Sequence, residues 1–351
     1  MGEMPRLSFA LASLLALVAV PALAQNFKLA ERNFEQIDSD GDGRISRTEW
    51  SGRGNFELLD GNGDGFLNVE ELAGMYMKRP WGRYAGAPSP GGGDPSIQTD
   101  KISGSDLPSS LSCALEVTHG CSINGAVARG LLATGMGPLF PDNTLCPGID
   151  DFFAMDYGFK NRKAGALHGG IDIPMPWDTP ILAAAAGTVV GVYGGETSMR
   201  GREVNLRHSP EDTGLPFWTY TQYSHLNAMP DLHVGDRVAM GQFLGPSGNS
   251  GTGPGSQGGG GQAAHRRPAI HFAAWQADGP RYADSGTGII AENGTWLDPV
   301  AFYRDAPPFA SAGLKALPDD QKAVLVPVIM NDGTVLPAGA KRIWPYSCAR
   351  K

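Results

Sequence analysis

The stretch LHGGIDIPMPW, Leu167 to Trp177, decides how most of this 351-residue chain is interpreted. It places His168 and Asp172 four residues apart. On a straight strand the two side chains would lie about 13 Å apart, whereas two ligands of one zinc ion, each ~2 Å from the metal, lie close together. Gly169 and Gly170 permit the bend that resolves this difference, because glycine tolerates backbone angles that other residues avoid. Taken alone, the pair is equally compatible with a turn around a hydrogen-bonded histidine.

Short β segments separated by glycine-rich turns follow this motif. They cover Ile181–Val192, Glu203–Arg207, Trp218–His225, Asp236–Leu244 and Ala269–Trp275. Helical periodicity is absent from most of this region, so an antiparallel sheet or sandwich is the expected class.

The last β segment contains another histidine, His271, in the sequence AIHF. Side chains two apart on a strand point the same way, so His271 shares its face with Ala269. At this point the histidine is either a metal ligand or a buried structural residue. The low-complexity loop at residues 250–262 leads into this segment.

Four separated motifs follow one another in a fixed order: HGGIDI, YSHLN, LHVGDRVAMGQFLGPSGNSG and AIHF. In this order they resemble the lysostaphin/LytM-type zinc endopeptidases of bacterial cell walls, over roughly residues 156–274. The resemblance implies that His168, Asp172 and His271 are zinc ligands, with a catalytic water in the open fourth position. It also implies that His225, in YSHL, handles protons and steadies the oxyanion.

One position departs from the pattern of that family. The family has a histidine two residues before the third ligand, and this chain has Ala269. General acid–base catalysis is worth about 10² to 10⁴-fold in rate, so its loss predicts weak activity unless another group replaces it. His265 is the candidate catalytic replacement, and the alternative is a solvated loop histidine. Arg266 and Arg267 either stabilise an oxyanion or face water. The other histidines match no motif and are interpreted as surface or structural residues: His119, His208 and His233.

Three functions are compatible with these motifs. The favoured one is an exported zinc metalloendopeptidase that cuts the peptide cross-links of peptidoglycan. The alternative is a non-catalytic module of the same fold that binds peptidoglycan or activates another cell-wall hydrolase. Ala269 favours that alternative, and the retained ligand set disfavours it. The third, a calcium-dependent adhesion or scaffold protein, leaves the zinc ligands without a role.

Two acidic loops near the N-terminus, DSDGDGRISRTE and DGNGDGFLNVEE, resemble the EF-hand family. Calcium takes about six to eight oxygen ligands, which such a loop supplies from positions 1, 3, 5, 7, 9 and 12. The predicted ligands of the first loop are Asp38, Asp40, Asp42, the Arg44 carbonyl, Ser46 and Glu49. Those of the second loop are Asp60, Asn62, Asp64, the Phe66 carbonyl, Asn68 and Glu71.

The two loops are expected to form one compact pair. Ile45 and Leu67 occupy position 8 of their loops, where two loops can pair through a short strand. The connection between the loops is short and contains two glycines, which disfavours a long connecting helix. Flanking helices are expected around Phe27–Ile37 and Val69–Lys78, with Phe34, Ile37, Leu72 and Met75 as core. Calcium is expected to act as a permanent structural clip.

The first residues have the pattern of an export signal. An apolar run, Leu7–Val20, precedes the small-residue motif Ala22-Leu23-Ala24. The run is shorter than the roughly 20 residues of a spanning helix. We therefore expect cleavage after Ala24, a periplasmic or extracellular location and no integral membrane segment in the mature protein.

The sequence thus predicts an α+β protein, with a small helical EF-hand pair followed by a mainly antiparallel β-sheet domain. The expected divisions are a signal peptide (1–24), the EF-hand pair (25–78), a flexible linker (79–111), the β-rich LytM-like peptidase domain (112–305) and a C-terminal extension with a hairpin (306–351). A formal net charge of -8 disfavours nucleic acid as a partner.

Four cysteines fit export, because disulfides form in oxidising compartments. Three pairings are possible. We favour Cys113 with Cys121, which closes a short loop, and Cys146 with Cys348, which ties down the C-terminus. A zinc site made of cysteines is the weaker alternative, because the chain has no C-x-x-C spacing.

Overall fold

The structure is a computed structural model that describes residues 30–50, 56, 60, 64–73, 93–116, 123–149, 168–194, 200–251 and 268–351. No helix within these ranges is long and apolar enough to cross a membrane. Several predictions fall outside the described residues: the signal peptide, Asn62, Met75, residues 79–92 of the linker, His119, Cys121, His265, Arg266 and Arg267.

The EF-hand region is a small unit with its own core. Residues 30–37 are helical, and β1 (Ile45–Ser46) pairs antiparallel with β2 (Phe66–Leu67), followed by α3 (Val69–Ala73). Ile45 lies opposite Leu67, as the loop positions predict. The core consists of Ala30, Phe34, Ile37, Ile45, Phe56, Leu67 and Leu72.

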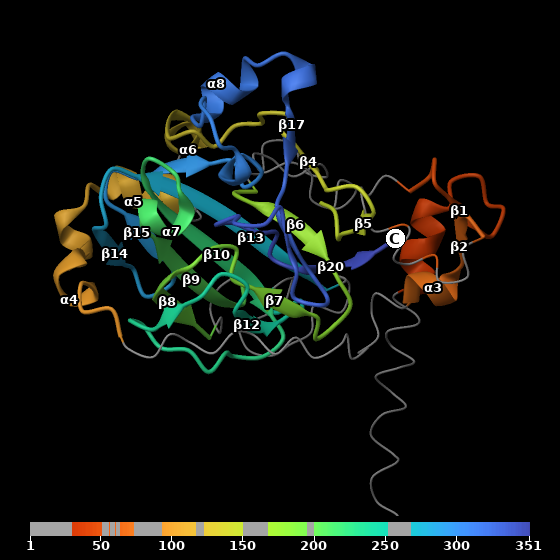
Figure 1. The fold of residues 1–351 in the computed structure, drawn as a ribbon, viewed down its shortest axis with the longest axis horizontal. Helices are drawn as coiled ribbons and strands as arrows, with labels where there is room; N and C mark the ends of the chain where they lie inside the picture. Colours follow the sequence, from red (N-terminus) through yellow and green to blue (C-terminus); the bar gives the residue numbers. More distant parts are fainter. Residues whose placement is uncertain are drawn as a thin grey trace, which may run out of the picture.

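A seven-stranded antiparallel sheet forms the centre of the larger unit (Figure 1). Its strands lie in the order β11-β8-β9-β10-β13-β16, and β6 pairs with the first half of β13. Their bounds are β6 (Ile171–Pro174), β8 (Gly187–Tyr193), β9 (Arg202–His208), β10 (Trp218–Leu226), β11 (Arg237–Val238), β13 (Ala269–Ala277) and β16 (Thr295–Leu297). The predicted fold class, a helical EF-hand region followed by a mainly antiparallel sheet, is confirmed.

The two faces of this sheet differ in chemistry, because successive side chains of a strand point to opposite faces. One face belongs to the apolar core and includes Val204, Leu206, Tyr223, Ile270 and Phe272. The other face is polar. Directly opposed residues of antiparallel strands share a face, and the register places Ser224 opposite His271 and Gln222 opposite Asn205.

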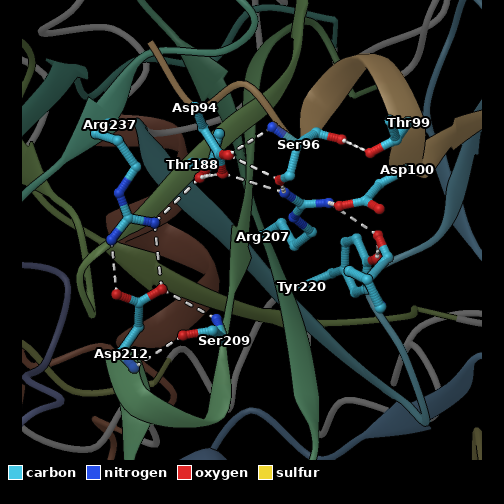
Figure 2. A network of polar contacts seen from close by, with 11 residues as sticks. Asp94, Ser96, Thr99, Asp100, Thr188, Arg207, Ser209, Asp212, Tyr220 and Arg237 are labelled. Atoms are coloured by element: carbon cyan, nitrogen blue, oxygen red, sulfur yellow. Dashed lines mark hydrogen bonds and ion pairs between the residues drawn. The ribbon is translucent and has the colours of Figure 1, made fainter. Parts of the chain in front are cut away.

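The polar face is covered by a segment that the sequence predicts to be linker. Residues 93–102 contain α4 (Ile97–Asp100) and β3 (Lys101–Ile102), and they lie against β9. Arg207 of β9 is buried and forms ion pairs with Asp94 (3.1 Å) and Asp100 (2.7 Å), as Figure 2 shows. A buried guanidinium needs such partners, so this part of the expected linker is held in place by the sheet.

Further elements complete this cover. β3 extends a sheet with β14 (Tyr282–Asp284) and β15 (Ile289–Ala291), and α5 (Ser109–Glu116) and α6 (Ile123–Ala128) lie nearby in Figure 1. Trp296 of β16 donates its indole N–H to the carbonyl of Ala114 in α5 (2.9 Å). This buried hydrogen bond joins α5 to β16.

The C-terminal residues pack on the other side of the main sheet. β18 (Val328–Met330) pairs with β19 (Val335–Leu336) across a turn, and β20 (Ser347–Arg350) pairs with β18 and with β5 (Thr144–Leu145). The Cys146–Cys348 disulfide is present as predicted, and Cys113 is disulfide-bonded too.

The remaining elements are η2 (Gly104–Asp106), β4 (Gly137–Leu139), β7 (Pro180–Leu182), α7 (Pro210–Thr213), β12 (Phe243–Pro246), η3 (Ala301–Tyr303), α8 (Ser311–Lys315), η4 (Asp319–Gln321) and β17 (Ala323–Leu325).

Candidate metal centre

The pairing of β6 with β13 brings together residues far apart in the sequence. Asp172 lies directly opposite His271, and His271 Nδ1 is 3.1 Å from Asp172 Oδ1. His168 Nε2 is 3.3 Å from the same carboxylate oxygen. One ligand atom from each of the three residues lies within 4.8 Å of the others. The structure therefore assembles the three predicted zinc ligands into one cluster.

Two glycines make this approach possible. Gly169 has a φ of +79°, in the left-handed region that other residues rarely adopt. A Cβ on Gly170 would lie 2.5 Å from His271 Nε2 and 2.7 Å from the Phe272 carbonyl oxygen. The bend between His168 and Asp172 thus depends on glycine at both positions.

The three clustered side chains are buried, and burial favours the neutral form of a histidine. The side chains of His168, Asp172 and His271 are only 2%, 3% and 9% exposed. Burial lowers the pKa of His271 to about 4, although the hydrogen bond with Asp172 opposes this shift. His271 is consequently neutral at pH 7, and neutral imidazole is the form that binds metal. Two histidines and one carboxylate form a donor set that catalytic zinc sites use, with one position left for water.

His225 stands beside the cluster because of an irregularity in β10. The pairing of β9 with β10 shifts between Tyr223 and Leu226, and His225 has a φ of +69°. Its ring centroid lies 6.0 Å from that of His271. Its backbone N–H donates to the carbonyl of Arg200 (2.9 Å). A bulge therefore aims the predicted catalytic histidine at the metal centre.

Comparisons with known proteins identify two regions of the chain. Residues 166–282 match the model of peptidase family M23, and residues 32–51 and 56–76 match the EF-hand model. The chain carries an M23 peptidase domain preceded by an EF-hand pair. No curated protein matches the chain.

Several solved structures are similar to the M23 domain. An alanine-to-histidine mutant of the catalytic domain of the M23 protein EnpA from Enterococcus faecalis is 25% identical, over 47% of this chain and 95% of that one (TM-score 0.29). The catalytic domain of lysostaphin from Staphylococcus simulans is 24% identical, over 34% and 77% (TM-score 0.26). LytU is 24% identical, over 36% and 74% (TM-score 0.27).

Ser250 is a residue of the M23 domain site that sequence reasoning missed. Its carbonyl oxygen lies 2.8 Å from His225 Nδ1. Its hydroxyl donates to the Leu226 carbonyl (2.8 Å) and accepts from the Arg202 N–H (2.9 Å). A carbonyl can only accept, so Nδ1 of His225 carries the proton and Nε2 is the acceptor of a neutral ring. The motif PSGNSG was quoted for the resemblance, but its residue types alone do not reveal this backbone contact.

Ala269 lies where the register expects it, opposite Pro174 and buried on the face of His271. The structure therefore shows no titratable group at this position of the M23 domain. The proposed substitute, His265, lies in the part of the chain that the structure does not describe.

Two other histidines play the structural or surface roles expected of them. His208 is buried, with Nδ1 2.6 Å from the Ala186 carbonyl and Nε2 2.8 Å from the Thr221 hydroxyl. Burial lowers the pKa of His208 to about 4. His233 is exposed at the surface of the domain.

The first EF-hand loop is wound around its predicted ligands. Carboxylate oxygens of Asp38, Asp40 and Asp42 lie within 4.8 Å of one another. Glu49 accepts hydrogen bonds from the N–H groups of Ser39 and Ser46, both at 2.8 Å. Hydrogen bonds from the backbone and hydroxyl of Ser46 are the main reason that the pKa of Glu49 falls to about 2. The three aspartate side chains therefore converge on one point, and Glu49 is held by the backbone of the same loop.

The second loop follows the same plan where it is described. Asp60 accepts from the N–H groups of Asp64 (3.1 Å) and Gly65 (2.9 Å). Glu71 accepts from the N–H of Asn68 (3.0 Å). Gly65 occupies position 6 of this loop, and its φ of +83° provides the sharp turn that this position requires.

Proposed function

We propose that this protein is an exported zinc metalloendopeptidase that acts on the peptide cross-links of peptidoglycan. The observation that carries the proposal is the convergence of His168, Asp172 and His271 in a buried cluster of the M23 domain, with His225 beside it. Zinc endopeptidases of bacterial cell walls are the family that the motifs resemble.

His168, Asp172 and His271 would hold the zinc ion. When bound there, zinc supplies Lewis-acid polarisation of the scissile carbonyl and of water. Ser250 fixes the His225 ring through Nδ1, so Nε2 is the nitrogen that exchanges protons with the reacting groups. The left-handed backbone of His225 and the 2.9 Å hydrogen bond from its N–H to the Arg200 carbonyl hold the ring beside the cluster.

The second candidate function is a non-catalytic module that binds peptidoglycan or activates another cell-wall hydrolase. The observation that favours it is Ala269, which puts a methyl group where the family has a histidine. The intact zinc cluster and the constrained His225 argue for catalysis, because a binding module has no need of either.

The EF-hand pair is proposed to bind calcium as a structural clip, through the ligands predicted for both loops. Export to the periplasm or the extracellular space is proposed from the N-terminal signal pattern. The Cys146–Cys348 disulfide is consistent with an oxidising compartment.

The test of the proposed function is hydrolysis of purified peptidoglycan in a zymogram, run with added zinc and with a chelator. We expect a cleared band that the chelator abolishes and zinc restores. Binding to peptidoglycan without clearing, in the presence of zinc, would favour the non-catalytic module.

A further inference from the structure

Glu203 of β9 is a fully buried carboxyl group on the polar face of the main sheet. Its Oε1 accepts from Asn205 Nδ2 (3.0 Å), and its Oε2 accepts from Ser224 Oγ (3.0 Å). Gln222 Nε2 lies 3.1 Å from both oxygens. All three donors are uncharged, so these bonds satisfy the carboxylate without neutralising it.

The Ser224 bond links Glu203 to the metal centre. Ser224 lies directly opposite His271 in the sheet and immediately precedes His225. The pairing of β9 with β10 becomes irregular right after Tyr223. The hydrogen bond between Glu203 and Ser224 therefore fixes the residue that directly precedes His225 in the bulge.

Arg200 places a positive charge near the same two sites. Its carbonyl accepts the His225 N–H (2.9 Å), and one guanidinium nitrogen donates to the Glu116 carbonyl (2.6 Å). The charge of Arg200 offsets part of the rise that burial causes in the pKa of the Glu203 carboxyl. Arg200 therefore favours the ionised form of this carboxyl.

Burying an ionised carboxyl destabilises the folded protein, because burial favours the neutral form. Burial is the largest influence on Glu203 and raises the pKa of its carboxyl. A glutamine could fill the same space without this cost. A divalent cation at the neighbouring cluster would favour the ionised carboxyl further, because Coulomb interactions are strong in a poorly solvated interior.

We propose that Glu203 is a positioning residue of the metal centre: it holds Ser224, and with it the His225 bulge, and its charge stabilises a zinc ion bound by His168, Asp172 and His271. The proposal rests on the proposed zinc centre and adds one residue to it. Mutation of residues that support the metal ligands without touching the metal typically lowers metal affinity or activity by about 10- to 100-fold.

The test measures zinc affinity of the full-length protein by competition with a chromophoric chelator. Glu203→Gln keeps the size of the side chain and removes its charge, and we expect it to weaken zinc binding about 10-fold or more. Glu203→Asp keeps the charge, and we expect it to bind zinc more tightly than Glu203→Gln. Glu292→Gln is the matched control, because Glu292 pairs with Arg281 at the edge of the domain, and it should leave the affinity unchanged.

A purely structural role for Glu203 predicts a different result. Glu203→Gln would then lower the melting temperature of the metal-free protein, while the folded fraction would bind zinc as the wild type does. Our proposal predicts a melting temperature at least as high as that of the wild type, together with weaker zinc binding. Where Glu203→Gln does not fold, the pair Glu203→Asp and Glu203→Asn decides, because only the electrostatic role predicts tighter zinc binding by the charged member of two side chains of equal length.

Failure of this proposal is distinguishable from failure of the proposed function. Zinc binding that Glu203→Gln does not change overturns the role of Glu203 and leaves the endopeptidase intact. The expected weaker zinc binding of Glu203→Gln, with no hydrolysis by the wild type, supports Glu203 and overturns the endopeptidase. A wild type that binds no zinc overturns both.

Discussion

The two candidate metal sites of this protein are organised in opposite ways. In the M23 domain, His271 and Asp172 are 99 residues apart and meet because β6 and β13 pair, inside a buried environment. In the first EF-hand loop, Asp38, Asp40 and Asp42 lie within one short and largely exposed turn. The first site is built by the pairing of two strands in a domain with a large apolar core. The second site gathers acidic side chains on an exposed loop, so we expect it to depend on its ion for most of its stability.

This difference predicts how each region depends on its metal. The M23 sheet has a large apolar core, whereas the EF-hand core contains seven described residues. Removing zinc should therefore abolish activity and leave the M23 domain folded. Removing calcium should unfold the EF-hand pair.

The largest expected effect is on catalysis within the preorganised site. His225→Ala should reduce peptidoglycan hydrolysis by about 10² to 10⁴-fold, because it removes the proton-transfer group. Its zinc content should stay at the wild-type level, since His225 is not a predicted ligand. The matched control is His233→Ala, which removes an exposed histidine and should leave the rate unchanged. Loss of zinc in His225→Ala would make His225 a ligand and contradict this division of roles.

A smaller gain is expected from restoring the missing histidine. Ala269→His places an imidazole on the face of His271 and should raise the rate about 10-fold or more, within the range of general acid–base catalysis. Kinetics on purified peptidoglycan measure the change. A fully active wild type that loses its activity in His265→Gln would show instead that His265 already performs this task.

Acid should destabilise the M23 domain before it protonates Glu49 of the first EF-hand loop. His271 and His208 have pKa values lowered from 6.5 to about 4 by burial. Between pH 6.5 and about 4, these two histidines are protonated in the unfolded chain and neutral in the folded chain. The free energy of unfolding of the metal-free domain should therefore fall as the pH drops from about 6.5 to 4, by on the order of 3 kcal/mol per histidine.

Urea unfolding of the metal-free protein at several pH values measures this dependence. His208→Gln should make the slope shallower, because it removes one of the two buried groups and touches no predicted ligand. Glu49, by contrast, stays charged until the pH approaches its pKa of about 2. Equal slopes in the wild type and in His208→Gln would contradict the assignment of this loss of stability to buried histidines.

The smallest effect should be that of calcium on the M23 domain. A calcium chelator should abolish the thermal transition of the EF-hand pair and leave that of the zinc-loaded M23 domain unchanged within a few degrees. Differential scanning calorimetry separates the two transitions. Asp38→Asn should reproduce the effect of the chelator on the first loop. A parallel loss of M23 stability would show that the two units are energetically coupled.

Sequence patterns predicted the local parts of this molecule well. The EF-hand loops, the Ile45–Leu67 pairing and the antiparallel sheet follow from residue spacing and alternation. The cluster of zinc ligands was predicted through family motifs, because no local rule brings β6 beside β13. The two glycines of HGGIDI were the local sign that the chain bends between His168 and Asp172.

Long-range packing of polar residues could not be predicted in this way. Residues 93–102 have a linker composition, yet Asp94 and Asp100 pair with the buried Arg207 more than a hundred residues later. The carbonyl of Ser250 positions His225, and a backbone contact leaves no mark on residue type. Glu203 resembles any strand carboxylate until the register places Ser224 between it and His271.

Metal analysis of the purified mature protein, wild type beside His271→Ala, tests the central claim most directly. The account predicts one zinc ion per wild-type chain and its loss in the variant, with calcium content the same in both. Both proteins should show the same far-ultraviolet circular dichroism, because the apolar core is untouched. Equal zinc in the two proteins would contradict the assignment of His168, Asp172 and His271 as the zinc site.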